Sequence, residues 1–130
     1  MATVTIEFNQ LPYNKSYRLK QGDGLEEAWH AKIKSEAATS YSDLNLTGCT
    51  LKLYISKNGT AVTGFSGTSV TPDVASEGKF RVRIPAASTT SWLGEYAYEL
   101  EVTFPEDHAN FPDGCTKTFL QGRITVSADL

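Results

Sequence analysis

Tyr96-Ala97-Tyr98-Glu99-Leu100-Glu101-Val102-Thr103-Phe104 is the stretch that decides the fold. Tyr, Leu, Val and Phe occupy every second position of this stretch, and Ala, Glu and Thr lie between them. Successive side chains of a β-strand point to opposite faces, so a period of two places one row of large apolar groups on a buried face. A helix would instead need apolar residues three and four positions apart. The stretch therefore predicts a long strand with one buried face.

The same alternation returns along most of the chain, at Val4, Ile6 and Phe8, at Leu51, Leu53 and Ile55, at Phe80, Val82 and Ile84, and at Ile124 and Val126. Turn-forming residues separate these runs: Asn58-Gly59, Gly64, Gly67, Pro72-Asp73, Glu77-Gly78, Pro85, Pro105 and Pro112-Asp113-Gly114. Asn58-Gly59 predicts a type I′ hairpin, because both residues tolerate a positive φ. Short strands between frequent turns predict an all-β fold, a single antiparallel β-sandwich of about seven to nine strands.

Two segments are less regular. Residues 25–38 (LEEAWHAKIKSEAA) consist of good helix formers, and Leu25, Ala28, Trp29 and Ile33 fit a helical face. Leu25, Trp29, Ala31 and Ile33 also fit one face of a strand, if Glu27 is tolerated there. From the residues alone both structures remain open. Near the C-terminus, Gly122 is expected to mark a bulge where the apolar phase slips between Phe119 and Ile124.

The totals restrict the class of protein. A chain of 130 residues is long enough for one hydrophobic core, and no change in composition indicates a boundary, so residues 1–130 are expected to form one domain. A net charge of -3 gives no basic surface for phosphates, so nucleic acid is not expected as a partner. The chain has neither a long apolar run nor a basic segment followed by an apolar one. We therefore expect no membrane partner, no signal peptide, and synthesis in the cytoplasm.

The residues that carry catalysis and metal binding are sparse. His30 and His108 have no nucleophile at a motif spacing, and Cys49 and Cys115 do not complete a four-ligand zinc set. His108 follows Pro105-Glu106-Asp107 in what reads as a solvated turn, and the carboxylates of Glu26-Glu27 read as solvated charge. The prediction is a non-enzyme without catalytic, metal or cofactor site. The two cysteines are expected as buried free thiols, with a single disulfide as the alternative.

Gly94 and Tyr96 have the spacing of a tyrosine corner, in which the phenol hydroxyl bonds to backbone at the edge of an immunoglobulin-like sandwich. The cysteine that antibody domains carry two residues later is replaced by Tyr98. This pair is therefore given a structural role. The predicted sandwich is immunoglobulin-like and lacks the antibody disulfide pattern.

Five motifs in order resemble a known family: Tyr17-Arg18-Leu19-Lys20-Gln21-Gly22-Asp23, Leu44-Asn45-Leu46-Thr47-Gly48-Cys49-Thr50-Leu51, Gly78-Lys79-Phe80-Arg81-Val82, Leu93-Gly94-Glu95-Tyr96-Ala97-Tyr98-Glu99-Leu100 and Gln121-Gly122-Arg123-Ile124-Thr125-Val126. The chain resembles the N-terminal domain of phage baseplate upper proteins and related free-standing modules of tailed phages. The resemblance spans about residues 17 to 128 and leaves residues 1–14 as an N-terminal extension. It implies a strand after the Gly22-Asp23 turn, in the segment whose residues alone leave both a helix and a strand open.

The resemblance also implies a function. It predicts a virion structural protein of a tailed bacteriophage, an adaptor or accessory subunit of the tail, baseplate or neck, present in multiple copies and bound to other phage structural proteins. The end of the chain at Leu130, where the family continues into a fibre or receptor-binding region, favours an adaptor over a receptor binder. The alternatives are a capsid decoration or head fibre protein of the same fold, and a small carbohydrate-binding module using Tyr13, Tyr17, Tyr41 or Trp29.

The candidate interface residues are Val4, Ile6 and Phe8 of the N-terminal extension, with the loop-flanking Tyr13, Tyr17 and Tyr41. The apolar face of the extension is expected to add either to its own sheet, as a first strand of the sandwich, or to the sheet of a neighbouring molecule.

Overall fold

The computed structural model describes residues 3–7, 11–34, 39–109 and 111–128. Ten strands follow one another in this part of the chain: β1 (Thr3–Glu7), β2 (Tyr13–Asn14), β3 (Tyr17–Lys20), β4 (Leu25–Ile33), β5 (Ser42–Asp43), β6 (Thr50–Lys57), β7 (Thr60–Val70), β8 (Lys79–Ile84), β9 (Gly94–Phe104) and β10 (Cys115–Ser127). Two short 3-10 turns, Ala75–Glu77 and Ala86–Ser91, flank β8. The all-β prediction is confirmed, and no helix in the described part is long and apolar enough to cross a membrane.

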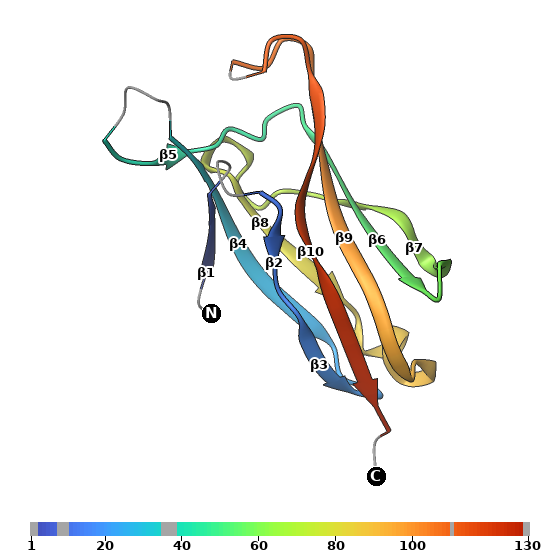
Figure 1. Ribbon diagram of the computed structural model, residues 1–130. Coiled ribbons are helices and arrows are strands. Elements are labelled where there is room, and N and C mark those ends of the chain that lie inside the picture. Colours follow the sequence, from blue (N-terminus) through green and yellow to red (C-terminus); the bar gives the residue numbers. More distant parts are fainter. Residues whose placement is uncertain (1–2, 8–10, 35–38, 110, 129–130) are drawn as a thin grey trace.

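The strands form two sheets (Figure 1). In the smaller sheet, sheet A, β4 pairs with β1 on one side and with β8 and β5 on the other. In the larger sheet, sheet B, β2 and β3 lie along one edge of β10, followed by β9, β6 and β7. The N-terminal run thus contributes first to sheet A and then to sheet B.

A single hydrophobic core joins the two sheets in a sandwich-like arrangement. Sheet A contributes Trp29, Phe80 and Val82, all at most 2% exposed. The alternating residues of β9, from Tyr96 to Phe104, fill the centre of sheet B's inner face. The period of two in the sequence therefore corresponds to the two faces of real strands. Residues 25–33 adopt the strand that the resemblance implies, with Trp29 and Ala31 buried.

The expectation of a single antiparallel sandwich of about seven to nine strands is correct for the all-β sandwich-like arrangement and wrong for the pairing of the N-terminal strands. β1 runs parallel to β4, and β2 and β3 run parallel to β10, so both sheets are mixed, and ten strands are present in the described residues. Turn residues indicate only hairpins between neighbouring strands, which are antiparallel. The parallel pairs join the start of the chain to strands far along it, and no local signal marks such contacts.

The predicted glycine positions are confirmed in one case and differ from the structure in two. Asn58 and Gly59 have φ of 51° and 80° and connect β6 to β7, as the type I′ prediction requires. Gly64 and Gly67, predicted as turns, instead lie inside β7 with positive φ, where the β6–β7 register is irregular. The slip in β10 lies between Thr118 and Leu120 and not at Gly122, because Phe119 and Leu120 are both buried there.

Candidate docking interface

The N-terminal extension supplies the edge strand of sheet A. β1 pairs with β4 in parallel, with Val4 opposite Trp29 and Ile6 opposite Ala31. Pairing within the chain's own sheet is therefore present. Among the strands that the structure describes, none pairs with the other edge of β1. Phe8, the third predicted residue, lies outside the described residues. The backbone groups on the outer edge of β1 are donors and acceptors of the kind that another chain can pair with.

The next segment, an arm formed by β2, Lys15, Ser16 and β3, lies along the edge of β10 (Figure 1). The backbone of Lys15 holds this arm in place through two hydrogen bonds. Its amide donates to the Gln121 carbonyl oxygen at 3.0 Å, and its carbonyl oxygen accepts a bond of 2.6 Å from the Tyr98 hydroxyl. A Cβ on Gly122 would lie 2.0 Å from that same carbonyl oxygen. Gly122 therefore allows the close approach of the arm to β10.

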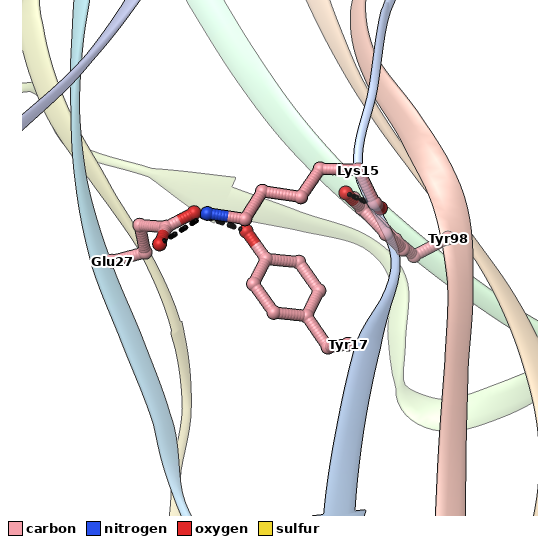
Figure 2. A network of polar contacts seen from close by, with 4 residues as sticks. All are labelled: Lys15, Tyr17, Glu27 and Tyr98. Carbon is pink, nitrogen blue, oxygen red and sulfur yellow. Dashed lines mark hydrogen bonds and ion pairs between the residues drawn. The ribbon is translucent and has the colours of Figure 1, made fainter.

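A polar network ties the arm to sheet A (Figure 2). Glu27 of β4 accepts two bonds: Lys15 Nζ lies 2.7 Å from Oε2, and the Tyr17 hydroxyl lies 2.5 Å from Oε1. The Glu27 side chain is 20% exposed and that of Lys15 is 33% exposed. Both carboxylate oxygens are thus paired in a partly dry space between the sheets, where an unpaired charge would be costly.

The tyrosines of this network hold their protons strongly. Burial, followed by the hydrogen bond to Glu27, raises the pKa of Tyr17 far above its usual range. Burial also raises the pKa of Tyr98 to about 12. Both phenols therefore remain neutral donors at physiological pH. The ammonium of Lys15 also lies over the rings of Tyr17 and Trp29, 5.5 and 5.6 Å from their centroids.

The interpretation of Glu27 as solvated charge is wrong. Glu27 lies on the inward-facing side of β4 with Leu25 and Trp29, as the alternation in the sequence indicates. A carboxylate at this position is tolerated only with partners from another strand. Those partners, Lys15 and Tyr17, lie 12 and 10 residues away in the chain. In the sequence, this site was indicated by a carboxylate at a position where the alternation places apolar residues.

The predicted aromatic candidates are only half-exposed or less. Tyr13 packs edge-on against Trp29 with ring centroids 5.5 Å apart, and Tyr17 lies 5.7 Å from Tyr98. Tyr41 is half-buried, with Lys34 Nζ 5.8 Å from its ring centroid. Trp29 is 0% exposed, so it cannot stack on a sugar. These four rings do not make one exposed platform.

Tyr96 lies at the start of β9, at the end of the sandwich. Its hydroxyl accepts a bond of 3.0 Å from the Leu93 amide, and its ring stacks on Trp92 with centroids 4.9 Å apart. Gly94 has a φ of 96°, which lets the chain turn between Leu93 and Tyr96. Lys57 reaches the same corner, where its ammonium lies 5.1 Å from the Tyr96 ring centroid.

The histidines and cysteines occupy structural positions. His30 Nε2 lies 2.7 Å from Asp43 Oδ1, which links β4 to β5. Glu106 and Asp107 form the exposed turn that was predicted, but His108 is 6% exposed, so the expectation that it is solvated is wrong. His108 donates to the Asn45 carbonyl oxygen at 2.6 Å and packs on Phe104. Cys49 and Cys115 are free thiols, and burial raises the pKa of Cys49 to about 11. The described residues contain no group of three or more possible metal ligands.

The fold can now be compared with known structures. Over 96% of both chains, the molecule superposes on a solved domain with a TM-score of 0.53 and 14% sequence identity. That domain is the N-terminal domain of phage TP901-1 ORF48. The resemblance to a phage module is therefore confirmed at the level of the fold. No protein-family model and no curated protein matches the chain.

Proposed function

We propose that this chain is a non-enzymatic structural subunit of a tailed-phage virion, in the tail, baseplate or neck, and that it binds other phage structural proteins in multiple copies. The observation that carries the proposal is the match to the ORF48 N-terminal domain along nearly the full length of both chains. The five ordered motifs support the same conclusion independently. The bond between Leu93 and Tyr96 supports an immunoglobulin-like relationship for the sandwich.

The outer edge of β1 is the docking surface that the geometry supports best. A free edge strand can pair with a strand of another chain through its backbone, which gives affinity without a deep pocket. The polar network holds the arm against β4, the strand with which β1 pairs. The edge is then carried by a strand whose pairing partner is braced, which lowers the entropy cost of binding.

The location is tested in purified particles of the phage whose genome encodes the chain. We expect mass spectrometry to detect the protein in gradient-purified virions and immunogold labelling to mark the tail end. Labelling of the head would favour the alternative, a capsid decoration or head fibre protein. Absence from purified particles would contradict a virion role altogether.

The docking edge is tested by deleting residues 1–9. The deletion removes β1 and leaves the arm and the core strands in place, so we expect a folded monomer that no longer joins the particle. Thermal unfolding of the truncated protein is the control for folding. A truncated protein that folds and is incorporated normally would show that β1 serves only its own sheet.

A further inference from the structure

The outer face of sheet B carries a groove that the docking interface does not use. Its central hollow, with a volume of about 460 Å³, is lined by side chains of Asn14, Tyr54, Glu99, Gln121 and Arg123 around Ala97. The strand register places Tyr54, Glu99, Gln121 and Asn14 in one row across four neighbouring strands. Ala97 in the adjoining row has a small side chain, which leaves the space between them open.

Two smaller hollows continue the central one along the strands. One of about 240 Å³ shares Tyr54 with it and extends to Thr50 and Thr116. The other, of about 260 Å³, shares Ser56, Ala97 and Arg123 with it and extends to the Asn58-Gly59 turn. Because neighbouring hollows share lining residues, the three form one groove along β6, β9 and β10. Such a groove suits an extended chain better than a compact ligand.

Tyr54 stands between two of the hollows, and its ring is fixed. A Cβ on Gly67 of β7 would lie 3.3 to 3.4 Å from the Tyr54 ring atoms Cε1, Cζ and Oη, so the ring rests against bare backbone there. The bulged register between β6 and β7 at Tyr54 places the glycine under it. A ring held in this way offers apolar contact area at little cost in side-chain entropy.

The polar groups around the ring are also oriented. Gln121 Nε2 donates to Asn14 Oδ1 at 3.0 Å, which fixes both amides and leaves Gln121 Oε1 and Asn14 Nδ2 without a protein partner among the described residues. Glu99 forms no ion pair in the same set, and burial, followed by the charge of Glu101 and a hydrogen bond with it, raises the pKa of the Glu99 carboxyl. The groove thus presents donors and acceptors that are not used by the fold.

We propose that this groove binds a neutral oligosaccharide chain, with Tyr54 as the stacking surface and Glu99, Gln121 and Asn14 as hydrogen-bonding groups. Of the tyrosines that line the three hollows, Tyr96 and Tyr98 are at most 6% exposed, so Tyr54 is the one aromatic ring that the groove presents. The centre of a protein interface usually clusters several aromatic and Arg anchors. Three carboxylates, on Glu95, Glu99 and Glu101, outnumber the cations of Lys52 and Arg123, which disfavours an anionic polymer. The site is independent of the virion role proposed above.

The test is an amide NMR titration of the full chain with cello-, malto-, xylo- and chitohexaose, and with a hyaluronan hexasaccharide as the anionic probe. We expect at least one neutral hexasaccharide to shift the amides of β6, β9 and β10 around Ala97, with a dissociation constant on the order of 0.1 to 1 mM. Tyr54→Ala should weaken binding about tenfold or more, and Glu99→Gln should weaken it less.

Val74→Ala is the control, because it trims an exposed apolar side chain that does not line the groove, and it should bind like the unmodified chain. The proposal is overturned if no neutral hexasaccharide shifts groove amides, if only hyaluronan does, or if Tyr54→Ala binds as well as Val74→Ala. Protection of these amides by a phage structural protein, without any sugar response, would assign the groove to a protein partner instead. None of these outcomes depends on where the chain lies in a particle.

Discussion

Lys15 and Gly122 show how much one residue can decide in this molecule. The Lys15 backbone lies so close to Gly122 that a single added carbon would meet the Lys15 carbonyl oxygen at 2.0 Å. The same carbonyl accepts the Tyr98 hydroxyl bond, and the Lys15 side chain pairs with Glu27. The sequence contains the glycine and the lysine, but nothing in their local context predicts that they meet.

Gly122→Ala is expected to destabilise the protein by about 1 to 3 kcal/mol, because the added methyl forces the arm away from β10. Gly24→Ala is the matched control, since Gly24 also has a φ outside the positive range but its nearest atoms would lie at 3.2 and 3.3 Å. Chemical denaturation of both variants measures the difference. An equal loss in the two variants would contradict the role assigned to Gly122.

At the scale of elements, the arm and β4 belong to different sheets and are joined by Lys15, Tyr17 and Glu27. The helix-or-strand ambiguity of residues 25–33 has its physical origin here. Glu27 fits a helix surface and conflicts with the buried face of an isolated strand, so the residues alone permit both structures. The strand is acceptable because the arm brings a cation and a phenol to the carboxylate.

A double-mutant cycle with Lys15→Met and Glu27→Gln measures this link. We expect a coupling free energy of about 1 kcal/mol or more, because the pair is partly buried and shares the Tyr17 hydroxyl. The control is the same cycle on Arg123 and Glu95, whose side chains are 69% and 63% exposed at a distance of 3.1 Å. That pair is expected to couple weakly. Equal coupling energies would show that the Lys15–Glu27 pair is an ordinary surface contact.

At the scale of the whole molecule, the two mixed sheets share one core and keep the phenols of Tyr17 and Tyr98 neutral between them. Raised pKa values in the folded state mean that the unfolded chain loses these protons first as the pH rises. The stabilisation is complete below the ordinary tyrosine pKa of about 10 and decreases as the pH rises above it.

The melting temperature is therefore expected to fall between pH 10 and about 12, where unfolded tyrosine is ionised and Tyr98 is still protonated in the fold. Tyr17→Phe and Tyr98→Phe should each reduce the slope of melting temperature against pH in this range, although Tyr17→Phe lowers stability at neutral pH by removing a donor to Glu27. Thermal melts at a series of pH values measure the slopes. Slopes identical to that of the unmodified chain would contradict the assignment.

The sequence by itself determined the all-β class, the central strand β9, the Asn58-Gly59 hairpin and the absence of a large charge, because these follow from alternation and turn chemistry between near neighbours. Only the tertiary structure decided the parallel pairing of the N-terminal run, the buried position of His108, the inward Glu27 with its partners and the groove beside Tyr54. Each of these depends on residues from strands distant in the chain, and local propensity carries no information about which distant strands become neighbours.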